Sequence, residues 1–168
     1  MYSVKLGFDA AIERIESLLE ANFNSEALVT SVFTAEKTLR RTLRQLMVSS
    51  GFISAHAVAQ LKQLRGLHAV AQAWRYYDPR HTTLPQVIGN QDWQVFTTGA
   101  DMRNKLIHGT RVYTSAACVD QTKAILDALK RAKRALDKQY GYSGWTPHSK
   151  RIRSTLHADP RVRMPRKT

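Results

Sequence analysis

The chain has 168 residues, a length that fits one compact domain with an appendage. Its 26 Lys and Arg residues against 13 Asp and Glu give a formal net charge of +13, which predicts a polyanionic partner such as nucleic acid without separating RNA from DNA. No apolar run suits a membrane span or a signal peptide, so we expect a cytoplasmic protein. The single cysteine, Cys118, excludes an internal disulfide and a cysteine-based zinc site, and we assign no metal or cofactor.

Two amphipathic helices are predicted in the first 50 residues. In residues 8–20, apolar side chains recur every three or four positions, so they share one face while charged residues take the other. After a turn at 22–25, helical spacing continues over residues 28–47 and ends at Gly51. The polar face of the second helix is basic, which indicates either contact with RNA phosphates or an ordinary solvated surface. Its candidate phosphate-binding residues are Arg40, Arg41 and Arg44.

Three further helical segments are predicted downstream. Residues 54–77 keep helical spacing, and Gly66 allows either one bent helix or two short ones. The Asp78-Pro79 pair stops this segment, and after a loop a fourth helix runs from about residue 90 to His108. A last helix covers about residues 115–140. Because no segment alternates as a strand does, the sequence predicts an all-α fold, a four- to five-helix up-and-down bundle over residues 1–140.

Residues 141–168 differ in kind from the bundle. Seven Lys and Arg residues against one Asp give this segment a charge of +6 (7 − 1), and three prolines interrupt any helix. This composition is typical of a basic tail. We expect Tyr142 and Trp145 to anchor its first residues to the bundle.

The run from Arg103 to His108 is the strongest candidate for chemistry. At about 100° per residue, Asp101, Asn104 and His108 share one stripe of the fourth helix, and the long Arg103 side chain can reach the imidazole. Metal-independent RNA cleavage needs a base, an acid and positive charge on the phosphorane, which His and Arg supply. One such motif holds one His, so this mechanism predicts a homodimer with a shared site.

The same residues also have a structural interpretation. A His just before the capping residue Gly109 interacts favourably with the helix dipole, and Arg103 with Asp101 can be a surface ion pair. We assign structural or surface roles to the other histidines, which lack metal-ligand spacing: His56, His68, His81, His148 and His157. The aromatic residues at 74–77 suit either stacking on unpaired bases or packing on the core.

The run Arg103-Asn104-Lys105-Leu106-Ile107-His108-Gly109 resembles the motif of the HEPN superfamily (higher eukaryotes and prokaryotes nucleotide-binding), and the resemblance covers residues 8–140. It implies a helical fold, dimerisation that joins two motifs, and a metal-independent endoribonuclease in RNA processing, defence or toxin–antitoxin systems. The family roles fall on Arg103, Asn104 and His108, with Glu36 or Asp101 as a supporting acid. Many toxins of the family carry a Tyr two residues after the His, where this chain has Thr110.

Two functions from different classes follow from these observations. The first is an endoribonuclease whose products end in a 2′,3′-cyclic phosphate, with an antitoxin or another regulatory protein as a further partner. Lys105 and Arg111 join the basic residues of the second helix as candidates for RNA contact. The alternative is a non-catalytic helical module that binds RNA or a partner protein through its basic faces and tail. A DNA-binding regulator is a third hypothesis, without a convincing helix-turn-helix.

Overall fold

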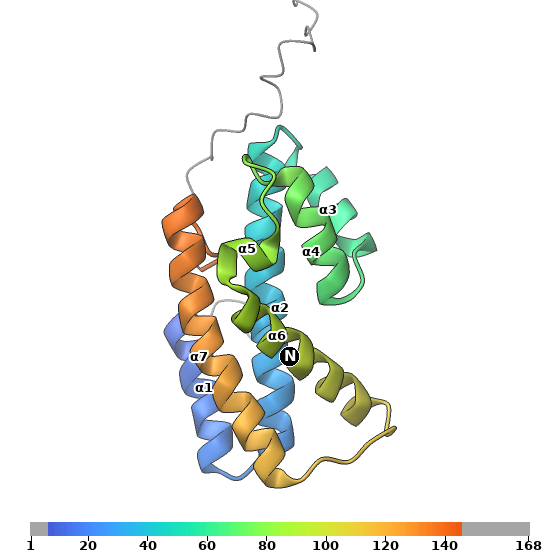
Figure 1. Cartoon of the computed structure of the whole chain (residues 1–168), viewed down its shortest axis with the longest axis vertical. Coiled ribbons are helices and arrows are strands. Elements are labelled where there is room, and N and C mark those ends of the chain that lie inside the picture. The colour runs from blue at the N-terminus through green and yellow to red at the C-terminus, as the bar shows by residue number, and fades with distance from the viewer. Residues whose placement is uncertain (1–6, 146–168) are drawn as a thin grey trace, which may run out of the picture.

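The computed structural model describes residues 7–145, which form seven helices (Figure 1). These are α1 (Phe8–Glu20), α2 (Asn24–Ser49), α3 (Ser54–Gln63), α4 (Gly66–Tyr77), α5 (Leu84–Ile88), α6 (Asn90–Ile107) and α7 (Ser115–Tyr140). The described range contains no strand, so the predicted all-α class is confirmed. Among these helices, none combines the length and the apolar character that a membrane span requires.

Seven helices are present where the sequence predicted four or five, for two reasons. The segment at 54–77 is divided, because Leu64 and Arg65 are extended and Gly66 adopts a left-handed φ of +73°. The Arg40 guanidinium donates hydrogen bonds of 2.9 and 2.5 Å to two backbone carbonyls at the end of α3, which satisfies acceptors that the helix leaves open. In addition, a capping box begins the short helix α5 inside the loop that follows α4.

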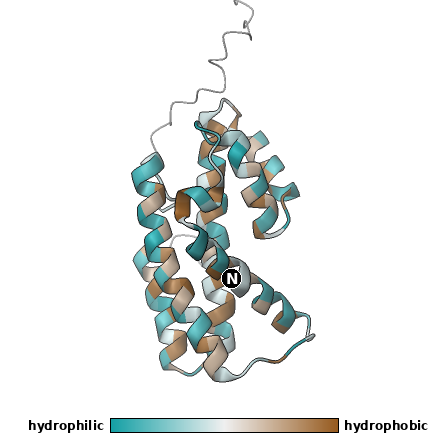
Figure 2. Ribbon diagram, viewed as in Figure 1, coloured by the Kyte–Doolittle hydropathy of each residue, from teal (hydrophilic) through white to brown (hydrophobic). Residues whose placement is uncertain are grey.

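Helix α2 lies at the centre of the bundle. It packs against α1, α6 and α7, and against α3 and α4 towards its C-terminal end (Figure 1). Its largest core residues are fully buried: Leu28, Leu39, Leu43, Leu46 and Met47. In Figure 2, hydrophobic and hydrophilic residues alternate along α1 and α7, as expected for helices with one buried face. Helix α6 crosses the others obliquely, and its C-terminal end projects away from the bundle (Figure 1).

Gly99 allows α6 to lie close to α2 and α7. It is buried, and a Cβ atom at this position would lie 2.5 Å from Ile125 Cδ1 and 3.2 Å from Val32 Cγ2. Gly99→Val should therefore lower the free energy of unfolding by about 2 kcal/mol through overpacking. Thr98→Val adds the same side chain at the exposed neighbouring position and should change stability by less than about 0.5 kcal/mol. Urea unfolding at neutral pH measures both, and equal stability of the two variants would contradict the prediction.

A buried hydrogen-bond network joins the end of α4 to the end of α7. Trp74 Nε1 donates to the Tyr140 hydroxyl at 3.0 Å, and that hydroxyl donates to Asp78 Oδ1 at 2.6 Å. The other Asp78 oxygen accepts from the Arg80 N–H and from the N–H and hydroxyl of Thr82, at 2.9, 2.8 and 2.5 Å. Burial, together with the bond to Asp78, raises the pKa of Tyr140. The network thus connects α4 and the loop after it to the C-terminal end of α7.

Trp145, one of the two residues predicted to anchor the chain after α7, packs against the bundle. Its Nε1 donates to Thr38 Oγ1 at 2.8 Å, and its ring packs edge-on against Phe8 with 5.7 Å between centroids. Lys37 Nζ and the Arg41 guanidinium each lie 5.2 Å from the indole centroid. Burial and the charge of Arg41 lower the pKa of Lys37. The rest of the predicted basic tail, residues 146–168, lies outside the described residues.

Candidate functional site

Arg103 is held by an ion pair with Glu36 that joins α6 to α2. One guanidinium nitrogen lies 2.7 Å from Glu36 Oε1, and the two side chains are 19% and 16% exposed. The Arg103 Nε atom is buried and has no hydrogen-bond partner among the described residues. Because a guanidinium carries five N–H donors, this arrangement fixes the group and leaves donors for a ligand. Glu36, one of the two acids that the sequence analysis singled out, is the one that contacts Arg103.

Arg103 and Asn104 line a cleft of about 240 Å³, which we call the Arg103 cleft. Helix α2 contributes one residue to its lining, the start of α4 contributes four, and α6 contributes five. The lining residues are Glu36, Arg65, Gly66, Leu67, His68, Thr97, Ala100, Asp101, Arg103 and Asn104. Two guanidinium groups, an imidazole, an amide, a hydroxyl and two carboxylates thus line one concave site. The carboxylates of Glu36 and Asp101 are paired with Arg103 and Lys105, and the guanidinium groups, the imidazole and the amide can donate hydrogen bonds to a phosphodiester.

Three of the five residues of α6 that line the cleft, Thr97, Asp101 and Asn104, share one face of the helix with His108. Thr97, Asp101, Asn104 and His108 are four, three and four positions apart, which places them within about 60° of one another around the helix axis. His108 does not line the cleft. It extends the cleft-facing stripe of α6 by one turn, about 6 Å beyond Asn104 along the axis.

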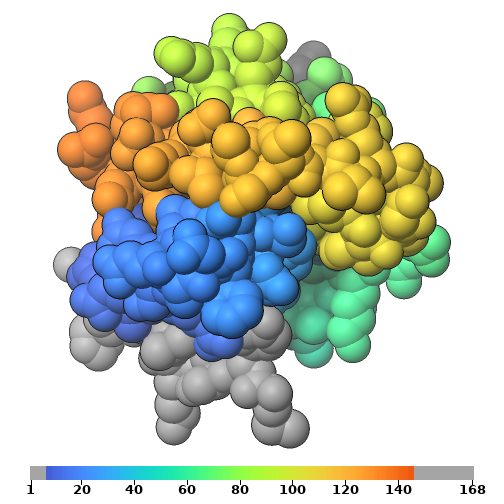
Figure 3. Space-filling view, turned by 90° about the horizontal axis from the view of Figure 1, so that it is seen from below, coloured from blue at the N-terminus to red at the C-terminus, as the bar shows by residue number. Residues whose placement is uncertain are grey.

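His108 occupies the C-terminal end of α6. Its N–H donates to the Asn104 carbonyl at 3.0 Å, and Gly109 follows with φ +64°, as the sequence predicted for a left-handed cap. The His108 side chain is exposed, and its apolar neighbours Ile107 and Val112 are 59% and 90% exposed. Figure 3 shows this end of the molecule, with the end of α6 and its following loop (yellow) beside the start of α2 (blue).

The structure corrects the alternative in which Arg103 pairs with Asp101 on the surface. Asp101 accepts instead from Lys105 Nζ at 2.6 Å, one turn further along α6, while Arg103 turns to Glu36. The hydrogen bond with Asp101 raises the pKa of Lys105. Both partners of this pair are solvent-exposed enough that water screens the interaction. Arg103 therefore joins α6 to α2 through Glu36 and does not form a local surface pair with Asp101.

The basic residues proposed from sequence for RNA contact lie outside the cleft. Arg41 donates to the Gly144 carbonyl at 3.2 Å, and Arg40 caps α3 as described above. Arg44 is exposed and hydrogen-bonds Ser54 Oγ. The guanidinium of Arg111, also exposed, lies 5.0 Å from the Tyr113 ring centroid. All four thus have contacts within the chain, and their role in binding RNA stays a prediction.

The aromatic residues at the end of α4 divide between core and surface. Trp74 is fully buried and bonded to Tyr140, so the core-packing interpretation is correct for this residue. Tyr77 is partly buried and packs against the core. Tyr76 is 60% exposed, with the Arg75 guanidinium 5.3 Å from its ring centroid. Of the three aromatic residues, Tyr76 alone presents the surface that base stacking needs.

Reasoning from sequence missed the residues that α4 brings to the cleft. The sequence predicts a structural or surface role for His68 and none for Arg65 or for Thr97 of α6. All three line the cleft, and the His68 ring packs edge-on against Trp93, with 5.6 Å between centroids. The residues around His68 in the sequence do not indicate that it lines a cleft, because His68 and Arg103 come to line the same cleft only when α4 packs beside α6.

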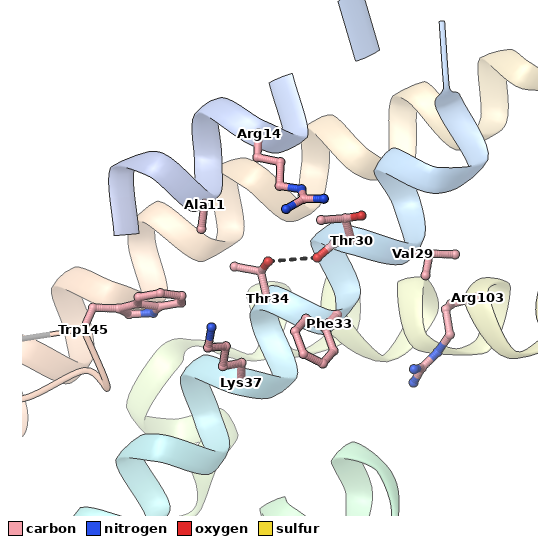
Figure 4. Close-up of a pocket in the computed structure, with 9 residues that line it drawn as sticks. All are labelled: Ala11, Arg14, Val29, Thr30, Phe33, Thr34, Lys37, Arg103 and Trp145. Carbon is pink, nitrogen blue, oxygen red and sulfur yellow. Dashed lines mark hydrogen bonds between the residues drawn. The ribbon is translucent and has the colours of Figure 1, made fainter. Parts of the chain in front are cut away.

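Arg103 also lines an apolar pocket of about 180 Å³ between α1 and α2 (Figure 4). The pocket combines two aromatic rings with three cationic side chains. It is lined by Ala11, Arg14, Val29, Thr30, Phe33, Thr34, Lys37, Arg103 and Trp145. Thr34 uses its hydroxyl internally, donating to the Thr30 carbonyl at 2.8 Å. Aromatic rings beside cationic side chains suit a ligand that combines a planar ring with a negatively charged group, such as a nucleotide with its base and phosphate.

Comparisons with protein-family models, curated proteins and solved structures find no match to this chain. Within residues 7–145, no group of three or more His, Cys, Asp and Glu residues is arranged to hold a metal ion. The side chains at the Arg103 cleft that could take part in chemistry include its two guanidinium groups, the amide of Asn104 and the imidazole of His68.

Proposed function

We propose that the chain is a metal-independent endoribonuclease of HEPN type that acts as a homodimer. The observation that carries the proposal is the position of Arg103. Glu36 holds its guanidinium, and Arg103 and Asn104 both line the Arg103 cleft. His108 follows one turn after Asn104 on the same face of α6. The resemblance of residues 103–109 to the family motif supports the proposal. The position of the motif also supports it, because the motif lies at the end of α6, the helix that precedes the last long helix, α7.

The proposed reaction is transesterification at an RNA phosphate. A neutral histidine takes the proton of the 2′-hydroxyl while the 2′-oxygen forms a bond to phosphorus. Arg103 stabilises the negative charge of the phosphorane, and Asn104 orients a phosphate oxygen. The bond from phosphorus to the 5′-oxygen then breaks, and a protonated histidine gives its proton to that oxygen. The products are a 2′,3′-cyclic phosphate and a free 5′-hydroxyl, and no co-reactant is consumed.

A second copy of the chain would meet the first at the end of α6. Ile107 and Val112 expose apolar surface beside His108, and Leu106 and Ile107 line a shallow groove with Val29 of α2. Burial of such side chains favours association. A two-fold axis at this edge would bring two motifs to one site. The net charge of +13 on each chain would then attract RNA to the dimer.

Incubation of the purified protein with mixed RNA in EDTA tests the proposal. We expect cleavage by the wild-type chain and a loss of about 10²-fold in rate for His108→Ala, because a proton-transfer group is removed. His108 is exposed, so the variant should fold, and His56→Ala on α3 is a matched control at another exposed histidine. Analysis of the product ends should show 2′,3′-cyclic phosphates. Equal rates for the wild type and His108→Ala would refute the proposal.

The second candidate is a non-catalytic module that binds RNA or a partner protein through its basic surface. The observation in its favour is the net charge together with exposed cations away from the cleft, such as Arg44 and Arg111. It predicts RNA binding that weakens steeply with salt, no cleavage, and no effect of His108→Ala. The EDTA experiment therefore separates the two candidates.

A further inference from the structure

One face of α2 carries an aromatic residue followed by cations. Its residues are Phe33, Lys37, Arg41 and Arg44, which lie within about 80° of one another around the helix axis and extend along it for about 16 Å. We call these four residues the basic face of α2. From Lys37 to Ser49, where the helix ends, α2 has no acidic residue. The face is therefore positively charged after its first residue.

The basic face begins at the apolar pocket between α1 and α2, where Phe33 is 51% exposed. In Figure 4 the Phe33 ring and the Lys37 ammonium lie between Trp145 at one end of the pocket and Arg103 at the other. An apolar cavity of about 150 Å³ can hold benzene, so a pocket of about 180 Å³ has room for one aromatic ring. Three of the described residues that line it are cationic and none is acidic. The pocket therefore suits one base of a polyanion.

Arg103 connects this pocket to the candidate site. It lines both the pocket and the Arg103 cleft, so a base beside Phe33 would lie next to a phosphate bound by Arg103. Val29 lines the pocket too, and it also lines the groove proposed for a second copy of the chain. The pocket thus adjoins the position where two motifs would share one site, and each copy in the dimer would present its own basic face.

Arg41 and Arg44, at the other end of the basic face, line a second pocket of about 450 Å³. Its lining also includes the Gln45 amide, the Ser54 hydroxyl and the Tyr142 phenol, and no acidic residue of the described chain takes part in it. Both arginines also make hydrogen bonds within the chain. Since a guanidinium carries five N–H donors, both keep donors for the oxygens of a phosphate.

Resting on the proposed endoribonuclease function, we propose that the basic face of α2 binds single-stranded RNA next to the cleaved phosphate. One unpaired base stacks on the Phe33 ring in the pocket, and Lys37 offsets the charge of the adjoining phosphate. Arg41 and Arg44 bind phosphates further along the strand. An RNA duplex offers the same phosphates, but its bases are paired and stacked inside the helix and cannot reach Phe33. The face therefore selects RNA with unpaired bases.

Fluorescence anisotropy with a labelled 2′-O-methyl RNA oligonucleotide, whose blocked 2′-oxygens prevent cleavage, tests the role of Phe33. Phe33→Leu keeps an apolar side chain and removes the ring, so the affinity for the single strand should fall about 10-fold. Phe33→Tyr keeps a ring and should bind within about twofold of the wild type. The matched control is Phe23→Leu, at the 55% exposed N-cap of α2 outside both pockets, which should bind like the wild type. Affinity for a duplex of the same sequence should be equal in all four proteins.

The salt dependence of binding tests the arginine contacts. The logarithm of the binding constant falls with the logarithm of the salt concentration, with a slope of about 0.7 for each phosphate of a single strand that is contacted. Arg44→Ala should make this slope shallower by about that amount, whereas Arg134→Ala, at an exposed arginine of α7, should leave it unchanged. With cleavable RNA, Phe33→Leu and Arg44→Ala should raise KM about 10-fold and leave kcat within about threefold, because they bind RNA away from the reacting atoms. Thermal unfolding checks that every variant is folded.

Failure of this inference can be told apart from failure of the proposed function. If the wild-type chain binds RNA without cleaving it, and Phe33→Leu weakens binding, the endoribonuclease function is wrong while the basic face stands as an RNA-binding surface. If Phe33→Leu and Arg44→Ala match their controls in affinity, salt slope and KM, the inference is overturned even where the wild type cleaves RNA. An equal loss of affinity for single strand and duplex in Phe33→Leu would overturn base stacking in this pocket.

Discussion

Arg103→Ala should lower the rate of RNA cleavage by about 10³-fold, the largest effect on activity that we expect from a single substitution. The guanidinium is positioned by Glu36 before RNA binds, so its interaction with the phosphorane needs little reorganisation. Removing it withdraws charge-assisted hydrogen bonds at the point where negative charge develops. Single-turnover kinetics with saturating protein measures this step directly. A rate within about twofold of the wild type would show that Arg103 does not act on the reacting phosphate.

Two further substitutions resolve how Arg103 acts. Arg103→Lys keeps the charge and loses the planar fork, so we expect partial activity that stays well below the wild-type rate. Glu36→Gln keeps the shape of the partner but weakens the ion pair at 2.7 Å, and the resulting misplacement should cost up to about 10²-fold. The pair is partly exposed, so the loss of stability in either variant should be about 1 kcal/mol. Activity is therefore compared at temperatures well below unfolding.

Asp78→Ala should lower the free energy of unfolding by about 4 kcal/mol, the largest effect on stability that we expect. The carboxylate is fully buried and accepts four hydrogen bonds, each worth about 1 kcal/mol or more when the acceptor is charged. Its removal also leaves the Tyr140 hydroxyl without an acceptor in a buried site. Urea unfolding at pH 7 measures the loss. Asp120→Asn, at an exposed position of α7, serves as a control and should be neutral.

The pH dependence of stability gives an independent test of Asp78. Burial alone would raise the pKa of this carboxyl, but hydrogen bonds from Thr82, Tyr140 and the backbone hold it below its usual range. Because the pKa is lower in the folded state, the stabilisation is present above the unfolded value of about 4 and is lost as the pH falls through the folded value. The stability gap between the wild type and Asp78→Asn should therefore narrow below about pH 4. A gap that stays constant to pH 2 would contradict this account.

Local patterns in the sequence were sufficient for the helices with one clear apolar face. The bounds of α1, α6 and α7 were predicted within a residue or two, because apolar spacing and the turn residues at each end act over one or two helical turns. The stripe that joins Asp101, Asn104 and His108 was predicted for the same reason, since helical geometry alone determines which residues share a face. The division at Gly66 was left open, because spacing continues across it.

Contacts between helices required the tertiary structure. Helical spacing shows which side of α6 carries Arg103, but not that α2 presents Glu36 to it, which depends on how the helices cross and on the close approach that Gly99 allows. The entry of His68 into the Arg103 cleft depends likewise on the packing of α4 against α6. The sequence thus predicts one half of the candidate site, the motif on α6. The packing of α2 and α4 against that helix supplies the other half, because the side chains that meet there come from segments whose patterns carry no information about one another.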